Sequence, residues 1–202
     1  MSESKAGSAK LSAEELPQTF AAMGIERAVL MTLEEGGSLR PPLDEPCVLQ
    51  QRVLPGILKG FNCLCIAPPR SGKTIAMSLA AAQRELLDSQ ARRNAGFLVL
   101  TPNATVQSGL LASLGSTVLS NPSLPVSVGP LRTLGQQLRF PLEAVAAVYV
   151  DDAHAFSEHD CAALRSLMAA FGRRRVQLCV FAERETECVR RVRDELLSSA
   201  SL

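Results

Sequence analysis

Residues 62–74, NCLCIAPPRSGKT, decide how this 202-residue chain folds. The apolar run Cys63–Ile66 has the length of a strand that is buried on both faces, and the run Ile75–Leu87 favours a helix. A strand, a tight loop that closes on Gly-Lys-Thr at 72–74, and a helix together form the arrangement of a phosphate-binding loop. Because free N–H groups and the helix dipole attract anions at such a junction, we predict a phosphate site here.

Five residues of this loop are candidate ligands of a nucleotide. Lys73 would reach the terminal phosphates, and the Thr74 hydroxyl would help to hold Mg²⁺. Ser71 and Gly72 lie directly before them and would meet the phosphates through the loop backbone. The loop begins at Ala67, although the full pattern asks for glycine at that position.

The composition is that of one globular domain, with 47% hydrophobic and 20% charged residues. The sequence contains no run of eighteen apolar residues, so we expect no membrane partner. The N-terminus has neither the apolar centre of a signal peptide nor the arginine-rich composition of a transit peptide. We therefore expect an intracellular protein, cytoplasmic or nuclear.

The cysteines and histidines do not predict a metal site. Cys63, Cys65 and Cys179 lie in apolar runs, which indicates small core residues in a reducing compartment. The spacing of the first two is not that of zinc ligands. His154 and His159 are too few for a metal site or a catalytic triad.

The charge is unevenly spread along the chain. Residues 1–45 hold four Lys/Arg and eight Asp/Glu, whereas residues 46–202 hold seventeen and twelve, a net charge of +5. That is mildly basic for a protein that contacts nucleic acid through phosphates alone. Aromatic residues make up 4% of the chain, so a surface for base stacking is not expected.

The chain divides into three predicted parts: a disordered tail over 1–11, a helical region over 12–61 and an α/β core over 62–202. A first helix is expected to start at the capping box Ser12-x-x-Glu15 and to carry Leu16, Phe20 and Met23. Two more are expected over 25–35 and over 48–59, the last of them capped by Gly60.

Apolar runs alternate with helical patterns from residue 62 onward. Strands are predicted at Cys63–Ile66, Phe97–Leu100, Pro125–Val128, Ala146–Val150 and Val176–Phe181. Helices are predicted at Lys73–Arg92, Ala104–Leu114, Leu131–Leu138, Glu158–Phe171 and Glu183–Leu197. Ser116–Ser120 is either a short edge strand or a loop. The alternation predicts a mostly parallel sheet that is covered by helices on both faces.

A pair of acids supplies the second half of the predicted site. Val148-Tyr149-Val150 is followed by Asp151-Asp152, and ligands bind at the carboxyl ends of the strands in sheets of this kind. Asp151 would orient Mg²⁺, and Asp152 would position the attacking water or accept its proton. The alternative is that Asp152 caps a helix that begins near Phe156.

These motifs resemble those of the DEAD-box and DExH RNA helicases of superfamily 2. Asp151-Asp152-Ala153-His154 is similar to motif II of that family. Pro46-Cys47-Val48-Leu49-Gln50, followed by Pro55 and Gly60, is similar to its Q motif, with matching spacing up to the phosphate loop. The family itself begins this loop with alanine, as at Ala67. The resemblance covers residues 16–198 and implies an N-terminal RecA-like lobe.

The resemblance implies an ATP site with Mg²⁺. By this resemblance, Asp152 and Lys73 would be catalytic, and Thr74 and Asp151 would bind the metal. The phosphate loop would include Ala67, Ser71 and Gly72. It also implies that the Gln50 amide reads the adenine edge, which would select ATP over GTP. On its residue type alone, Gln50 could instead be a solvated helix residue.

Two substitutions depart from the family on the ATP side. Pro69-Arg70 stands where the family has Thr-Gly, and Arg70 would cost about 1 kcal/mol if its φ is positive. Asp152 stands where the family has Glu, which draws the carboxylate back by one methylene. An error of about 1 Å in such a group can cost on the order of a hundredfold in rate.

The motifs that face RNA are more altered still. Thr101-Pro102-Asn103 lacks the arginine that the family has in motif Ia, and Arg132 alone keeps a charge in the next motif. Phe181-Ala182-Glu183 replaces the family's Ser-Ala-Thr. The sequence also ends after this lobe, without a second lobe to supply arginine fingers. Clustered arginines at 173–175 and in the last predicted helix are expected to be exposed to solvent.

We therefore expect an ATP-binding, helicase-like domain with weak or no hydrolysis and unwinding on its own. Its expected partners are ATP, RNA bound weakly, and a protein or a second RecA-like lobe. A first alternative is a non-catalytic scaffold derived from a helicase lobe. A small P-loop kinase is a second alternative, although the chain shows no arginine-rich lid.

Overall fold

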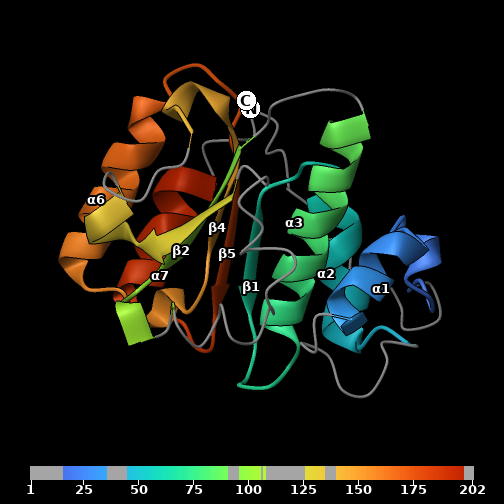
Figure 1. Cartoon of the computed structure of the whole chain (residues 1–202). Coiled ribbons are helices and arrows are strands. Elements are labelled where there is room, and N and C mark those ends of the chain that lie inside the picture. The colour runs from blue at the N-terminus through green and yellow to red at the C-terminus, as the bar shows by residue number, and fades with distance from the viewer. Residues whose placement is uncertain are drawn as a thin grey trace, which may run out of the picture.

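The computed structural model describes residues 16–35, 45–90, 96–105, 107, 126–134 and 140–197. Within them the chain forms a five-stranded parallel sheet in the order β1-β5-β4-β2-β3 (Figure 1). The strands are β1 (Cys63–Ile66), β2 (Gly96–Thr101), β3 (Val126–Pro130), β4 (Val145–Val150) and β5 (Gln177–Ala182). The helices are α1 (Arg27–Glu35), α2 (Val48–Leu58), α3 (Lys73–Gln90), α6 (Glu158–Ala170) and α7 (Glu187–Val192). Short 3-10 turns lie at Ala21–Met23, Leu131–Thr133, Leu142–Ala144 and Ala153–Ala155, and a π turn at Arg193–Leu197 follows α7.

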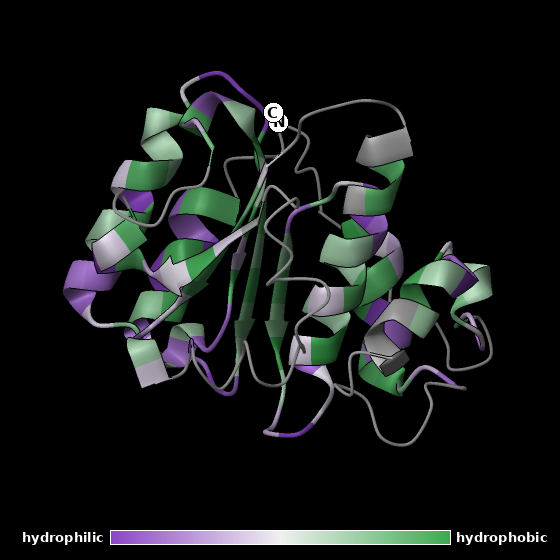
Figure 2. Ribbon diagram, viewed as in Figure 1, coloured by the Kyte–Doolittle hydropathy of each residue, from purple (hydrophilic) through white to green (hydrophobic). Residues whose placement is uncertain are grey.

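Helices cover both faces of the sheet, with α1, α2 and α3 on one side and α6 and α7 on the other (Figure 1). The alternation of side chains along each strand divides the core in two. On β4, Tyr149 faces the α1–α3 layer, whereas Val148 and Val150 face the α6–α7 layer. Both layers are apolar where they meet the sheet (Figure 2). The predicted α/β class, a parallel sheet with helices on both faces, is confirmed.

Local sequence signals account for most of the helix ends. Ser157 and Asp160 form a reciprocal capping box at the start of α6. The α2 helix ends at Leu58, and Gly60 takes a left-handed φ of 84° just beyond it, as predicted for a helix cap. Thr186 caps α7 by accepting a hydrogen bond from Val189 N.

Three helix predictions need correction. Leu16–Thr19 is not helical, and only the 3-10 turn Ala21–Met23 forms in the part of the first predicted helix that the structure describes. The last helix begins at Glu187 and not at Glu183, because Thr186 provides the cap. Asp152 does not cap α6, since Ser157 does. The predictions for 1–15, Ser116–Ser120, 108–114 and 135–138 lie outside the described residues.

The buried cysteines behave as core residues. Cys65 and Cys179 are buried in β1 and β5, and burial together with the nearby Cys65 raises the pKa of Cys63 to about 12. Cys161 of α6 and Cys188 of α7 form a disulfide with Cα atoms 6.0 Å apart, a pair that the sequence did not indicate. None of the helices in the described part of the chain has the length and apolarity needed to cross a bilayer.

Candidate nucleotide site

The phosphate loop joins the end of β1 to the start of α3, as predicted. Lys73 is the first residue of α3 and is 6% exposed. Its ammonium group donates to the carbonyls of Ala67 at 2.8 Å and Pro68 at 2.7 Å. The Lys73 ammonium group is therefore already hydrogen-bonded within the loop, and it would have to leave these carbonyls to contact a phosphate.

The loop keeps the backbone shape of a glycine-rich loop without one of the glycines. Gly72 has φ 93°, and Arg70 has φ 60°. A left-handed conformation disfavours a residue with a Cβ, by roughly 1–2 kcal/mol. The sequence analysis expected strain at Arg70 if its φ is positive, and the φ of 60° is positive.

Residues from the Q-motif-like segment contact this loop. Cys47 Sγ donates to Ser71 O at 3.3 Å. A Cβ added at Gly72 would lie 3.0 Å from Cys47 Sγ and 3.1 Å from Gln50 Nε2, so the helix α2 and the loop are closely packed. Ser71 Oγ is buried and has no hydrogen-bond partner among the described residues. Such an atom calls for a ligand, and a phosphate oxygen would fit it.

Gln50 is buried at 3% exposure and is not a solvated helix residue. Its Oε1 accepts the Cys47 N–H at 2.9 Å, which satisfies one free donor at the start of α2. The sequence analysis did not predict that Gln50 caps α2, and it did not predict that Cys47 contacts the phosphate loop. The spacing between Cys47 and Gln50, three residues, is the signal that could have indicated the cap.

Asp151 brings the second half of the site to the loop. It follows β4 and is 4% exposed. Burial, and then the charge of Asp152, raise its pKa to about 6, although the Asp152 N–H, the Lys73 ammonium and a hydrogen bond from Thr74 act in the opposite direction. The structure therefore places Lys73, Thr74 and Asp151 together at the carboxyl edge of the sheet.

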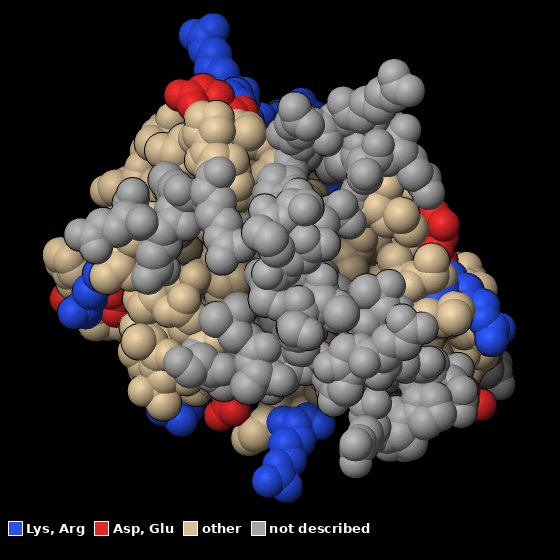
Figure 3. Space-filling view, viewed as in Figure 1, with Lys and Arg blue, Asp and Glu red and all other residues tan. Residues whose placement is uncertain are grey.

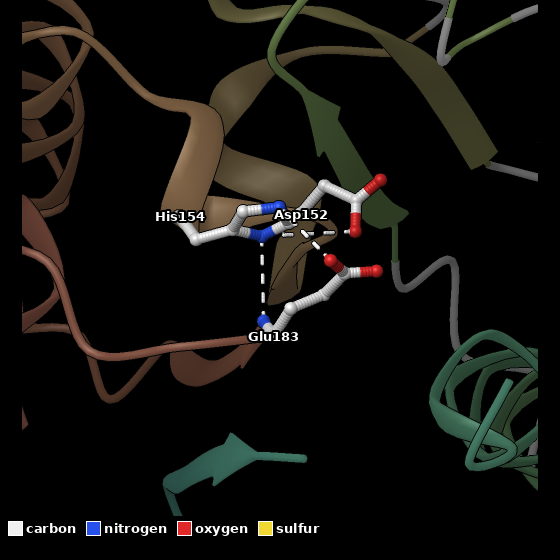
Figure 4. Close-up of side chains that lie close together, drawn as sticks. All are labelled: Asp152, His154 and Glu183. Atoms are coloured by element: carbon white, nitrogen blue, oxygen red, sulfur yellow. Dashed lines mark hydrogen bonds and ion pairs between the residues drawn. The ribbon is translucent and has the colours of Figure 1, made fainter. Parts of the chain in front are cut away.

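Asp152 points toward a different group of side chains. It has φ 50° and follows Asp151 into the turn Ala153–Ala155. His154 faces the carboxylates of Asp152 and Glu183, with Nδ1 3.9 Å from Asp152 Oδ1 and Nε2 3.5 Å from Glu183 Oε2 (Figure 4). Glu183 N also donates to His154 Nδ1 at 3.3 Å. The sequence analysis noted Glu183 only as a replacement of the family's threonine and did not predict its contact with His154.

Comparisons with known proteins concern the fold of the chain. Over 89 residues the chain is 35% identical to a protein described as "Probable ATP-dependent RNA helicase DDX28" from Mus musculus and to its Homo sapiens counterpart. Each match covers 42% of this chain and 16% of the relative. A solved structure of a variant of S. cerevisiae Dbp5 bound to a Gle1 variant and IP6 superimposes with a TM-score of 0.69. That match covers 90% of this chain and 51% of Dbp5 at 16% identity.

The chain has the fold of a helicase RecA-like lobe. The matches span a small part of the curated relatives and about half of the yeast chain, and no protein-family model matches the sequence. The resemblance to the DEAD-box helicases, first given by the phosphate loop and by residues 151–154, is thus supported by the fold as well as by sequence identity.

Arg132, whose side chain is 56% exposed, is held by an acidic side chain of the same chain. Arg132 donates to both Asp160 carboxylate oxygens, at 2.8 and 3.3 Å, and to Ser157 Oγ at 3.0 Å. Burial would raise the pKa of Asp160, but the hydrogen bonds from Arg132 and Ser157 hold it below its ordinary value. This pair ties the turn Leu131–Thr133 to the start of α6, and a phosphate would have to compete with it for Arg132.

The residues at the carboxyl edge fit a triphosphate with Mg²⁺. The first turn of α3 supplies N–H groups that have no partner within the helix, and Lys73 supplies a cation. Thr74 and Asp151 offer the hydroxyl and carboxylate oxygens that Mg²⁺ prefers. Pro68 and Pro69 remove two N–H donors from the loop, which leaves the cradle with fewer hydrogen bonds than a glycine-rich loop has.

Proposed function

We propose that this helicase-like lobe binds ATP with Mg²⁺ and, by itself, hydrolyses it slowly or not at all. The observation that supports this most is the convergence of Lys73, Thr74 and Asp151 beside a loop with an unpartnered buried hydroxyl. Bound Mg²⁺ would neutralise charge on the phosphates. Within the chain, Lys73 binds the terminal phosphates, Thr74 and Asp151 hold the metal, and Ala67, Ser71 and Gly72 shape the cradle.

The proposed weakness in hydrolysis rests on Asp152. Its carboxylate is one methylene shorter than glutamate, and its neighbours are His154 and Glu183, so it is poorly placed to position water over the phosphates. Arg70 holds the loop in a conformation that glycine would adopt without strain. These departures affect the rate of the chemical step more than the binding of ATP.

RNA binding is proposed to be weak for this lobe. Arg132 is engaged by Asp160, and Asn103 stands near the position of the arginine in motif Ia of the family. On the face shown in Figure 3, the described Lys and Arg side chains stand apart near the rim. A few separated cations give weak affinity that falls steeply with salt.

A second candidate function is a scaffold that binds a protein or a second RecA-like lobe. The observation that favours it is the pairing of Arg132 with Asp160, because an arginine held by a carboxylate is less available to an RNA phosphate. ATP could still serve such a scaffold as a structural ligand.

A nucleotide titration tests the proposal. ATP, ADP and GTP, each with and without Mg²⁺, are added to the 202-residue chain and to Lys73→Ala, and binding is followed by calorimetry and thermal melting. We expect ATP affinity between micromolar and millimolar, about −8 to −4 kcal/mol. Equal stabilisation of wild type and Lys73→Ala by ATP would contradict the proposed site.

A further inference from the structure

Asp152, His154 and Glu183 form a side-chain cluster with the donor set of a metal site (Figure 4). Each residue can offer one ligand atom such that the three atoms lie within 4.8 Å of one another. They come together because β4 and β5 pair in parallel and end side by side. We propose that this cluster binds a divalent transition-metal cation, of which Zn²⁺ is the best match.

The separation between His154 Nε2 and Glu183 Oε2 is close to that between two ligands of one metal, whereas the distance to Asp152 is measured from the other ring nitrogen. Tetrahedral zinc with bonds of about 2.0–2.2 Å holds its ligand atoms roughly 3.3–3.6 Å apart. His154 Nε2 lies 3.5 Å from Glu183 Oε2, and His154 Nδ1 lies 3.9 Å from Asp152 Oδ1. The two carboxylate side chains are 32% and 31% exposed, whereas the imidazole is 13% exposed. Closing the site therefore takes rotation of two surface carboxylates around a fixed ring.

A neutral imidazole gives one lone pair to a metal and keeps a proton on its other nitrogen. The three ligand atoms that lie within 4.8 Å of one another include a single nitrogen of His154, so only one ring nitrogen would bind the metal. The hydrogen bond that Glu183 N donates to Nδ1 is long, at 3.3 Å, and replacing it costs little.

The charge and the chemistry of the donors favour zinc over magnesium. Asp152 and Glu183 bring two negative charges, which a divalent cation neutralises. One nitrogen with two carboxylate oxygens suits Zn²⁺ and leaves a fourth position for water. Mg²⁺ prefers oxygen ligands in octahedral geometry, as Thr74 and Asp151 would provide. The two sites are adjacent, and their ligands differ in type.

Two of the three residues of the cluster differ from the motifs of the resembled family. Asp152 stands where the resembled family has glutamate, and Glu183 stands where it has threonine. If Asp152 positions water as proposed above, a metal on its carboxylate would withdraw it from that task and slow hydrolysis. This last consequence rests on the proposed function, but the binding of metal does not.

The test is a titration of the full chain with ZnCl₂ alone, without nucleotide, at pH 7.5 by calorimetry, with Co²⁺ absorption as a second readout of nitrogen and oxygen ligation. We expect one Zn²⁺ per chain. His154→Asn and Glu183→Thr should each weaken its binding at least about a hundredfold. His159→Asn and Glu185→Thr change the same residue types outside the cluster and should bind Zn²⁺ as wild type does. Thermal melting without metal confirms that each variant is folded.

Two further variants separate the zinc cluster from the ATP site and from a zinc-binding thiol. Lys73→Ala should lose ATP and keep Zn²⁺, so failure of the ATP site would not be mistaken for failure of the metal site. Cys47→Ser removes an exposed free thiol and should also keep Zn²⁺. Absence of Zn²⁺ binding would overturn the proposal. So would binding that survives in His154→Asn, or binding that disappears in Cys47→Ser.

Discussion

The phosphate loop and the corner formed by Asp152, His154 and Glu183 lie at the same edge of the sheet and differ from the resembled motifs in different ways. The loop changed residues and kept its backbone, since Arg70 holds the left-handed conformation of a glycine. The corner differs from the resembled motifs by one added carboxylate, that of Glu183, which faces His154 together with the carboxylate of Asp152. A loop defined by backbone N–H groups tolerates substitution at a cost in strain, whereas a site defined by side chains acquires a different ligand preference.

The largest expected effect belongs to the loop. Lys73→Ala removes the cation that now bonds Ala67 and Pro68, and we expect ATP affinity to fall by at least about 3 kcal/mol, or a hundredfold. The measurement is ATP–Mg²⁺ calorimetry. Lys59→Ala, at the exposed end of α2, is the matched control and should bind ATP as wild type does. Retention of ATP by Lys73→Ala would place any nucleotide site elsewhere.

The second largest expected effect is a pH-dependent change in stability on replacing Asp151, which belongs to the nucleotide site and not to the corner. Its pKa is raised from 3.8 to about 6, so the folded state disfavours its charge. Its contribution to stability is complete below about pH 4 and is lost as pH rises through 6. Asp151→Asn should therefore be about 1–3 kcal/mol more stable than wild type at pH 7.5, and the gain should vanish toward pH 4.

Urea unfolding at several pH values measures this difference. Asp194→Asn, which removes an exposed carboxylate, should show no comparable gain above pH 6. A gain from Asp151→Asn that is constant across pH would assign the effect to packing and not to the buried charge.

The sequence predicted the loop better than the corner for a physical reason. Cys63–Ile66 and residues 146–150 are continuous apolar runs next to local signals, so β1 and β4 were placed to within one residue. Glu183 meets His154 only because β5 lies next to β4, which no local pattern encodes. The pairing of Arg132 with Asp160, 28 residues apart, likewise depends on the tertiary fold. For the same reason the disulfide between α6 and α7 had no local signal.

The third effect concerns strain at Arg70. Arg70→Gly should relieve about 1 kcal/mol of left-handed strain, partly offset by the greater freedom of glycine in the unfolded chain. We expect a small rise in melting temperature. Gly72→Ala is the opposite control, because its Cβ would meet Cys47 Sγ at 3.0 Å at a φ of 93°, and it should be less stable than wild type.

Arg70→Gly combined with Asp152→Glu tests whether these two residues limit ATP hydrolysis. The double variant should raise basal phosphate release, because both changes act at the phosphates. We expect no strand separation by these 202 residues in a duplex-displacement assay, because both substitutions act at the phosphates and neither adds a contact to RNA. ATP-dependent displacement by the 202-residue chain alone would overturn the picture of a lobe that cannot unwind RNA by itself.

The smallest expected effect tests whether Gln50 serves the base or only the helix. Its Oε1 already accepts the Cys47 N–H, so Gln50→Ala should cost about 1 kcal/mol of stability through the cap in either case. If the amide also reads adenine, the preference for ATP over GTP should fall by about 1 kcal/mol, roughly fivefold. Because stability affects both nucleotides alike, the ratio of the two dissociation constants isolates base recognition. Gln51→Ala, also buried and one position along α2, should leave that ratio unchanged. A wild type with equal affinity for ATP and GTP would make Gln50 a cap that supports the loop, and adenine recognition would then have to be abandoned.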